Sequence, residues 1–369
     1  MIYFDNAATT YKKPECVIKA VRDCIRKYSA NPGRGAHRLS LKASEAVYNA
    51  RECVARFFST PCPERVVFTY NTTYALNIAI KTLIKPGSHV LISNLEHNSV
   101  LRPVHKLKEI YGVEYTVFNA MADDLTDEIV SQIRPQTDAI ICTAASNVTG
   151  RQISIDLLGR IKQEYGVKLI IDAAQAAGHK RISLQDGSFD AICFPAHKAM
   201  LGIMGCGVCI FGANSVDSSL IEGGSGTSSK SLYMPQALPE ASEAGTLGLP
   251  GIVALSEGIK FLESYGIDEV EKRVNYLTDL VIDRISNVCG AKIVGASNGV
   301  ISFLLRDIGS EELAAMLDEQ GICTRAGLHC APMAHKALGT LETGAVRVSL
   351  SIFNTKREID KFYRVLRGI

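Results

Sequence analysis

The sequence predicts an α/β protein with a mostly parallel central sheet covered by helices, followed by a smaller α+β unit. Short apolar runs alternate with helical periodicity through the first two-thirds of the chain, which indicates the sheet. The runs are apolar on both faces, as is typical of parallel strands buried between two layers of helices. After about residue 250 the pattern changes to long helices with a few strands, which indicates the second unit.

The carboxyl ends of the expected strands carry polar residues. The strands are RVVFT (65–69), HVLIS (89–93), AIICTAAS (139–146), VKLIID (167–172), FDAICF (189–194) and GVCIF (207–211). In open parallel sheets, ligands gather outside the carboxyl ends of the strands. The polar or ionisable residues that follow these runs are Asn71, Thr72, Thr73, Glu96, His97, Asn147, Asp172, His197 and Lys198. We therefore expect a site at this edge of the sheet.

The second unit is expected to hold helices at 251–266, 270–285 and 310–321, with strands at 299–307 and 345–353. Ser310 is the expected N-cap of the third helix, because two glutamates follow it in the first turn. Thr355 and Glu358 form a capping box that opens a last helix. We expect a large domain over residues 15–250 and a small α+β domain formed by residues 1–14 and 251–369.

Composition and charge exclude several classes of protein. A formal net charge of +2 gives no electrostatic case for nucleic acid or an anionic membrane as the main partner. No apolar run reaches the roughly 18 residues of a membrane span, and the opening MIYFDNAATT lacks the layout of a secretory signal. Eleven cysteines without framework spacing favour reduced thiols and a cytoplasmic location. Cys206 and Cys209 have C-x-x-C spacing without a second pair, so we interpret them as buried strand residues and expect no metal.

Lys198 and Asp172 are the main candidates for chemistry. Burial after a strand would lower the pKa of Lys198, and an amine of that kind can form a Schiff base with an aldehyde. Taken alone, a lysine that reaches solvent from a strand end is the more common case. Asp172 ends its own strand, where a carboxylate suits a protonated pyridine nitrogen. The alternative role of Asp172, about equally frequent, is the N-cap of a following helix.

Two further elements would complete a site for an aromatic phosphate. Thr72 and Thr73 offer hydroxyls and free backbone N–H groups at a helix N-terminus, which forms an anion site. His97 follows another strand, where its ring could lie flat against an aromatic ring. The alternative for His97 is a satisfied loop histidine, the more common fate of a single histidine.

The order of these signals resembles the class V aminotransferase family of fold-type I pyridoxal phosphate (PLP) enzymes. The motifs that carry the resemblance run almost from end to end: YFDNAATT, NPGRGAHRLSLKASEAVYNAR, FTYNTTYALN, EHNS, SNVTG, DAAQ, HK, EAGT, RAGLHCAP and VRVSLSIFNT. Within the family, the chain is most similar to the cysteine desulfurases and selenocysteine lyases that have a short cysteine loop. The resemblance implies PLP as the cofactor.

The resemblance also implies a role for each matching residue. Lys198 would hold the cofactor as a Schiff base and move protons on the substrate. Around the ring, Asp172 would pair with the pyridine nitrogen, Gln175 would contact the phenolic oxygen, His97 would stack, and Thr72, Thr73 and His197 would hold the phosphate. Thr246 of EAGT would reach the phosphate of a neighbouring subunit, which implies a homodimer. For the substrate, Arg347 would bind the carboxylate with Asn147 nearby, while Arg34, His37 and Arg325 would line the entrance.

Cys330 lies in the stretch TRAGLHCAPM (324–333). The resemblance implies that its thiol attacks the sulfur of L-cysteine, leaving L-alanine and a persulfide for an acceptor protein. The nucleophile must be a thiolate, and His329 and Arg325 are neighbours of the kind that lower the pKa of a thiol. The alternatives are a packing cysteine, a selenocysteine lyase, another lyase or aminotransferase of this fold with Cys330 incidental, and a binding module that has lost its chemistry.

Some positions depart from the family's usual pattern. Pro195 and Ala196 precede His197 where relatives commonly carry a serine, which removes one phosphate hydrogen bond. Asn71 stands where a glycine is usual. Leu328 occupies a position where close relatives often have a second histidine, and this change bears on the preferred substrate rather than on the cofactor.

Overall fold

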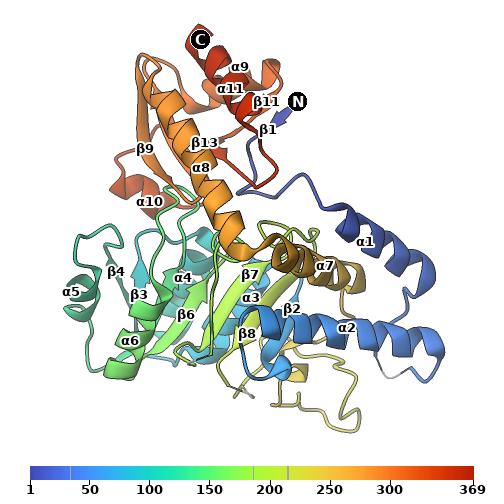
Figure 1. Ribbon diagram of the computed structural model, residues 1–369. Helices are drawn as coiled ribbons and strands as arrows, with labels where there is room; N and C mark the ends of the chain where they lie inside the picture. Colours follow the sequence, from blue (N-terminus) through green and yellow to red (C-terminus); the bar gives the residue numbers. More distant parts are fainter. Residues whose placement is uncertain (34, 186, 214–215) are drawn as a thin grey trace.

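A seven-stranded sheet forms the centre of the larger unit (Figure 1). The computed structural model describes residues 1–33, 35–185, 187–213 and 216–369. The strands, in spatial order, are β2 (Val66–Thr69), β8 (Gly207–Phe211), β7 (Ala191–Pro195), β6 (Lys168–Asp172), β5 (Thr137–Thr143), β3 (His89–Ser93) and β4 (Glu114–Phe118). Only β8 runs against its neighbours, because it pairs antiparallel with both β2 and β7. The prediction of a mostly parallel sheet is confirmed, and β4 is the strand that the prediction missed.

Both faces of this sheet are buried under helices. Along β5, Ile140 and Cys142 belong to one hydrophobic cluster, whereas Ala139 and Ile141 belong to another. Successive side chains of a strand point to opposite faces, so the two clusters lie on the two sides of the sheet. The helices of this unit are α1 (Glu15–Lys27), α2 (Arg38–Phe57), α3 (Thr72–Leu83), α4 (Asn98–Tyr111), α5 (Leu125–Val130), α6 (Ile155–Tyr165) and α7 (Leu249–Tyr265). Helices α2, α6 and α7 contribute to the first cluster, and α3 and α4 to the second.

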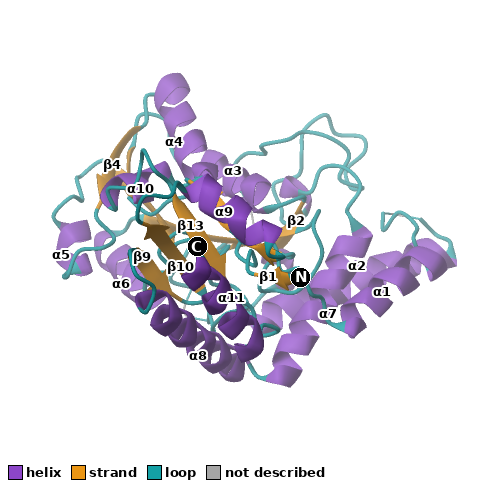
Figure 2. Ribbon diagram, turned by 90° about the horizontal axis from the view of Figure 1, so that it is seen from above, coloured by secondary structure: helices purple, strands orange, loops and turns teal. Residues whose placement is uncertain are grey.

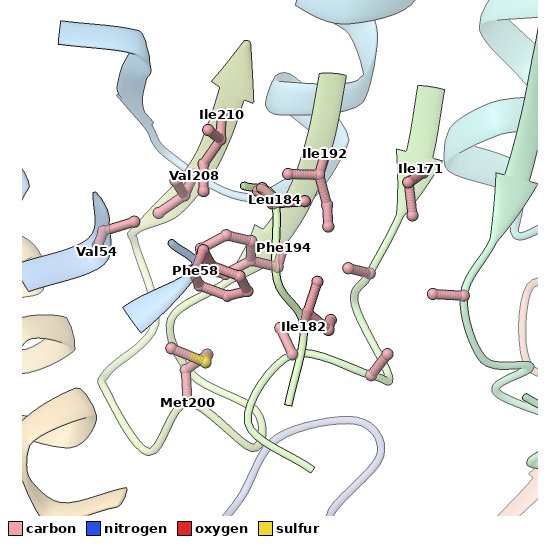
Figure 3. Close-up of a cluster of buried hydrophobic side chains, with 14 of the residues drawn as sticks. Val54, Phe58, Ile171, Ile182, Leu184, Ile192, Phe194, Met200, Val208 and Ile210 are labelled. Carbon is pink, nitrogen blue, oxygen red and sulfur yellow. The ribbon is translucent and has the colours of Figure 1, made fainter. Parts of the chain in front are cut away.

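Aromatic and aliphatic side chains fill the first cluster, which Figure 3 shows in part. Phe58, just after α2, packs on Phe194 of β7 with 4.6 Å between the ring centroids. Val208 and Ile210 of β8 lie beside these rings (Figure 3). Cys206 is buried in this cluster just before β8, and Cys209 of β8 is buried in the second cluster, so both are buried as expected but only Cys209 is a strand residue. This packing fixes the strand ends that carry the polar residues.

The smaller unit is a four-stranded antiparallel sheet with its own helices. Its strands, in spatial order, are β12 (Arg325–Gly327), β13 (Ala345–Ser349), β10 (Val300–Leu305) and β9 (Ala291–Ser297). Its helices are α8 (Ile267–Ser286), α9 (Ser310–Glu319), α10 (Pro332–Ala337) and α11 (Lys356–Gly368). The N-terminal strand β1 (Ile2–Tyr3) pairs in parallel with β11 (Ile322–Cys323). Phe4 then packs into the core of this unit, edge-on to Phe362 of α11.

The helix boundaries test two capping predictions. Helix α11 begins after Thr355 with the expected capping box to Glu358, so this prediction is confirmed. The prediction for α9 is wrong, since its N-cap is Gly309 and Ser310 is the first helical residue. The hydroxyl of Ser310 donates to the carbonyl oxygen of Thr343 at 2.8 Å, a tertiary bond that replaces the cap.

Helix α7 packs side by side with α1 and α2 of the larger unit (Figures 1 and 2). These contacts favour placing the domain boundary after α7, and the division into domains at residues 15–250 stays a prediction. Within the described residues, no helix combines the length and the apolar character that crossing a bilayer requires.

Candidate active site

Three neighbouring strands end at one pocket of about 570 Å³, open solvent at its mouth included. The last residues of β5, β6 and β7, namely Thr143, Asp172 and Pro195, all line it. The structure brings eight of the predicted site residues together in this lining: Thr72, Thr73, His97, Asn147, Asp172, Gln175, His197 and Lys198. The expectation of a site at the carboxyl edge is therefore met by the geometry, while the individual roles stay predictions.

Lys198 lies three residues after β7 and is only partly exposed. Burial lowers the pKa of its amine to about 8, and the neighbouring Arg347 acts in the same direction. Asp172 opposes the shift because its negative charge favours the ammonium form. A lysine with this pKa holds more free amine at neutral pH than an ordinary lysine, which is the property a nucleophilic amine needs.

Asp172 is the last residue of β6 and is 4 % exposed. One carboxylate oxygen accepts the backbone N–H of Ala174 at 2.9 Å. The alternative role as a helix N-cap is wrong, because a series of turns, not a helix, follows this strand. Burial raises the pKa of Asp172, and the charge of Lys198 counteracts that rise. A buried carboxyl group thus faces the pocket with room for a cationic partner.

The anion end of the pocket holds two buried polar atoms without partners in the described chain, Oγ1 of Thr72 and Nδ1 of His197. Buried polar groups are normally hydrogen-bonded, so such a pair is typical of a place that receives a ligand. Thr72 opens the twelve-residue helix α3, whose first backbone N–H groups point the same way. Burial lowers the pKa of His197 to about 4, so its ring is neutral at pH 7. Asn71 is the N-cap of α3, a task that explains an asparagine in place of glycine.

His97 lines the pocket and also caps a helix. Its Nδ1 accepts the backbone N–H of Ser99 at 3.0 Å, which starts α4. Burial, with the nearby positive charge of Lys198, lowers the pKa of His97 to about 4. The ring is thus neutral and oriented at the pocket as a satisfied loop histidine, and its stacking on an aromatic ring stays a prediction. Ser99 also shares a hydrogen bond of 2.8 Å with the hydroxyl of Thr73.

Gln175 directs its side-chain amide toward the N-terminal segment. Its Nε2 donates to the carbonyl oxygen of Ala7 at 2.9 Å, and the side chain is 5 % exposed. Segment 5–10 therefore forms part of the support of the pocket. Lys13 reinforces it by donating to the carbonyl oxygen of His197 at 2.9 Å, with a pKa lowered to about 8 by burial.

Asp5 joins two arginines beside the pocket, and sequence reasoning missed it. Arg347 of β13 is 2 % exposed and donates to Asp5 at 3.0 Å and to the carbonyl oxygen of Asn147 at 3.0 Å. Arg325 donates to the same carboxylate through Nε at 2.9 Å and Nη2 at 2.7 Å. The Nε of Arg347 has no partner among the described residues. Guanidinium groups held in a fixed orientation can bind a carboxylate through paired hydrogen bonds, so the substrate role of Arg325 and Arg347 stays a prediction.

Cys330 is exposed on a loop that the pocket residues hold in place. The carbonyl oxygen of Cys330 accepts the backbone N–H of Asn98 at 2.7 Å, and that of His329 accepts Nδ2 of Asn147 at 2.6 Å. A negative charge at Cys330 would raise the pKa values of both Lys198 and Arg325, which places the thiol close to them.

The expectation that His329 assists the thiol as a positive neighbour is not met. Burial lowers the pKa of His329 to about 3, so the ring is neutral. Its two nitrogens face His335 and the carbonyl oxygen of Arg325 rather than Cys330. Arg325 is therefore the cationic group that remains beside the thiol.

Among the described residues, five predicted site residues are not part of this lining: His37, Thr246, Arg325, Cys330 and Arg347. His37 caps α2 by accepting the N–H of Ser40, and Thr246 is exposed with Asn31 as a weak partner at 3.5 Å. Arg34 lies outside the described residues. Thr246 lines a separate open cleft of about 1590 Å³ together with Asn31, so its predicted contact requires a second subunit.

The sequence predicts Glu96 at this edge of the sheet and assigns it no role. Its carboxyl group is completely buried, accepts hydrogen bonds from Ser93 and from the N–H of Thr143, and faces Asp172. Burial raises its pKa to about 8. The described residues contain no cluster of three or more histidine, cysteine or acidic side chains placed to hold a metal.

The sheet topology, the strand-end lysine and the carboxyl group opposite it define a fold-type I enzyme. The chain belongs to the class V aminotransferase family, whose sequence profile matches residues 2–362. Members of this family are PLP-dependent.

Named relatives give the comparison more detail. A probable cysteine desulfurase of Methanothermobacter thermautotrophicus is 33 % identical, over 100 % of this chain and 94 % of that protein. One of Halalkalibacterium halodurans is 31 % identical, over 98 % and 91 %. Two solved structures are similar throughout. The apo cysteine desulfurase of Thermococcus onnurineus has a TM-score of 0.88 and 28 % identity over 100 % of this chain and 94 % of that one. The cysteine desulfurase CsdA of Escherichia coli has a TM-score of 0.90 and 25 % identity over 99 % and 94 %.

Proposed function

We propose that this protein is a PLP-dependent cysteine desulfurase that converts L-cysteine to L-alanine and transfers the sulfur to Cys330. One observation carries the proposal: the loop with the exposed thiol is hydrogen-bonded to Asn147, which lines the same pocket as the reactive lysine amine, and the two groups come from two different units of the chain. Lys198 comes from the end of the large sheet, and Cys330 comes from the loop beside β12. The similarity to proteins named cysteine desulfurases supports the substrate.

The residues of the pocket fit PLP. The partnerless atoms of Thr72 and His197 suit its phosphate, because a helix N-terminus with free donors stabilises an anion. The buried carboxyl group of Asp172 suits its pyridine nitrogen, and the neutral ring of His97 offers a flat surface. When bound, PLP supplies an electron sink that stabilises negative charge on the substrate carbon.

The chain's own residues then have distinct tasks. Lys198 moves a proton to and from the substrate, for which a pKa of about 8 is well matched to neutral pH. Arg347 binds the carboxylate of cysteine and is held by Asp5 and Asn147. Arg325 is the cationic group beside the thiol of Cys330.

Sulfur transfer balances without an external oxidant or reductant. The Cβ–Sγ bond of cysteine breaks while an S–S bond forms between its sulfur and Cys330. The electron pair of the broken bond stays on the substrate carbon, which takes up the proton that the thiol lost. Cysteine and the enzyme thiol thus give alanine and an enzyme persulfide.

A selenocysteine lyase is the second candidate, and Leu328 favours keeping it. This residue is exposed on the same loop and supplies no proton donor or acceptor beside the thiol. Selenium leaves more readily than sulfur and depends less on the thiol. Another lyase or aminotransferase of this fold, with Cys330 incidental, remains the third candidate.

The deciding experiment compares both substrates in wild-type protein and Cys330→Ser. We expect alanine release from cysteine to fall by about 10²-fold or more, because covalent catalysis lowers the barrier by several kcal/mol. Release from selenocysteine should fall less. Mass spectrometry should place one added sulfur on Cys330. Release from cysteine at the wild-type rate in the variant, or an added sulfur on another cysteine, would show that Cys330 only packs.

The proposal extends to assembly and location. A homodimer explains why Thr246 lies away from its own chain's pocket, and a fully active monomer in ultracentrifugation would contradict it. All eleven cysteines are free thiols, which supports a reducing compartment such as the cytoplasm. The exposed Cys330 loop would hand its sulfur to an acceptor protein.

A further inference from the structure

Three buried side chains form a line behind the Cys330 loop. Nδ1 of His329 lies 3.2 Å from Nε2 of His335, and Nδ1 of His335 lies 2.8 Å from the hydroxyl of Thr340. The two imidazole rings stack with their centroids 5.4 Å apart. At the near end of the line, Nε2 of His329 lies 3.3 Å from the carbonyl oxygen of Arg325. His335 and Thr340 belong to α10 and to the turn after it.

The direction of these hydrogen bonds is determined by the chemistry of their ends. The carbonyl oxygen of Arg325 can only accept, so Nε2 of His329 carries the hydrogen. The ring is neutral, because burial and the charges of Arg347 and Arg325 disfavour a second proton, and its Nδ1 must therefore accept. Nε2 of His335 is then the donor, and its Nδ1 accepts from Thr340. The opposite direction would set a lone pair of His329 against the carbonyl oxygen of Arg325.

The backbone that this line supports is strained. His329 and Cys330 have φ values of 52° and 57°, and both residues thus lie in the left-handed region. L-residues adopt this region at a cost of about 1–2 kcal/mol each. A backbone bond within the loop spans the pair, from the N–H of Ala331 to the carbonyl oxygen of Leu328 at 2.9 Å. The ring of His329 is the side-chain anchor of the same strained pair.

We propose that His335 is a positioning residue: by donating to His329 it holds the strained pair His329–Cys330 in one conformation and aims the thiol at the substrate. The proposal rests on the proposed function for the part that concerns sulfur transfer. His335 does not touch the substrate, and it acts only through His329. Thr340 fixes the ring of His335 in turn.

Two variants of His335 separate donation from packing. His335→Phe keeps a flat buried ring without a donor, whereas His335→Gln keeps an N–H near the position of Nε2. The matched control is His89→Phe, because His89 is equally buried and is bonded to Thr137 and Thr116 at the start of β3. All variants are loaded with cofactor and given cysteine for a single turnover, and the persulfide on Cys330 is quantified by mass spectrometry.

We expect His335→Phe to slow persulfide formation tenfold or more, since displacements of about 1 Å can cost 10²-fold. KM for cysteine should stay within about twofold of wild type, because the carboxylate site is untouched. His335→Gln should recover most of the rate, and His89→Phe should retain it. Equal rates in the Phe and Gln variants of His335, or an equal loss in His89→Phe, would overturn the proposal.

Two readouts do not depend on turnover, so they distinguish this proposal from the proposed function. Long-range ¹H–¹⁵N spectra should show both His329 and His335 protonated at Nε2, and a proton on Nδ1 of either would overturn the direction. Hydrogen exchange at the amide of Ala331 should be faster in His335→Phe than in wild type or His335→Gln, and unchanged exchange would overturn the support of the loop. If wild-type Cys330 carries no persulfide, the proposed function fails while these two measurements still decide the positioning role.

Discussion

The pocket and the group of residues beside it differ in how their polar groups are satisfied. The cofactor wall, formed by Thr72, His97, Asp172, His197 and Lys198, leaves buried atoms of Thr72 and His197 without partners among the described residues. The thiol wall, formed by Asp5, Arg325, His329, Cys330 and Arg347, is joined by ion pairs and hydrogen bonds. On the thiol wall, Nε of Arg347 is the one buried side-chain atom that has no partner in the described part of the chain.

This difference separates two tasks. Unpartnered donors are costly in an empty pocket and are stabilising once a ligand accepts from them. A closed network resists movement and therefore positions a reacting group. The cofactor wall is built to receive a ligand, and the thiol wall is built to hold a nucleophile still. Variants on the two walls should therefore fail in different assays.

The largest effect is expected from Lys198→Ala. Without the amine, the protein should lose the visible absorbance of retained cofactor and all detectable alanine release. Lys13→Ala is the matched control, because Lys13 has the same lowered pKa of about 8 but donates to a backbone carbonyl. We expect Lys13→Ala to keep the absorbance. An unchanged spectrum in Lys198→Ala would exclude it as the cofactor lysine.

Asp5→Asn should damage the thiol wall next most severely. It leaves the buried guanidinium of Arg347 without its ion pair, and the free energy of unfolding should fall by about 3 kcal/mol. KM for cysteine should rise, because Arg325 and Arg347 lose their common orientation. Asp138→Asn, which breaks the ion pair with Lys168 at the far end of the sheet, should lower stability and leave KM unchanged. An unaltered KM in Asp5→Asn would separate Asp5 from the substrate site.

Paired threonine variants sharpen the comparison directly. Thr72→Val removes a hydroxyl without a partner, so cofactor-free stability should change little while affinity for PLP falls by about tenfold or more. Thr340→Val removes the donor to His335, so stability should fall by about 1–2 kcal/mol with PLP affinity unchanged. Urea unfolding and cofactor titration measure the two quantities. The same pattern in both variants would remove the distinction between the walls.

A loss of stability in mild acid is also expected. Four histidines, His97, His179, His197 and His329, have pKa values lowered to between about 3 and about 4. Their contribution is complete above the unfolded pKa of about 6.5 and is lost as the pH falls toward 4, by about 1 kcal/mol per pH unit for each ring.

Glu96 opposes this trend, because its raised pKa favours the folded state as the pH falls through 8. Net destabilisation between pH 6.5 and 4 is still expected, since four groups outweigh one. Urea unfolding at pH 7, 6 and 5 measures it. In His179→Gln, the free energy of unfolding should fall less steeply with pH, by the contribution of one ring. A slope equal to that of wild type would contradict the contribution assigned to His179.

The sequence predicts the cofactor wall far better than the thiol wall. Asp172, His197 and Lys198 each follow a fully apolar strand, so a local pattern places them at one edge. Asp5 meets Arg347 across 342 residues, and no periodicity signals such a pair. His335 lies in a helix of six residues, too short to show an amphipathic pattern.

The missed strands have a similar explanation. The side chains of β4 and β9 are mostly half-exposed, so these segments lack both the apolar run and a clean alternation. Local pattern finds elements whose burial is complete, whereas edge strands depend on tertiary pairing. The wrong prediction of Ser310 as an N-cap also has a tertiary cause. The hydroxyl of Ser310 donates to the carbonyl oxygen of Thr343, which is distant in the sequence.

The ion pair between Asp5 and Arg347 also bears on when the site forms during folding. It closes a loop of nearly the whole chain, and contacts of such long sequence separation form late. During synthesis, Asp5 is made early. Its carboxylate can orient Arg325 and Arg347 only after β13 has been made. In a growing chain, the loop with Cys330 is therefore not aligned with the rest of the site until β13 has been made. On refolding from denaturant, sulfur transfer should return after the large sheet has regained its structure.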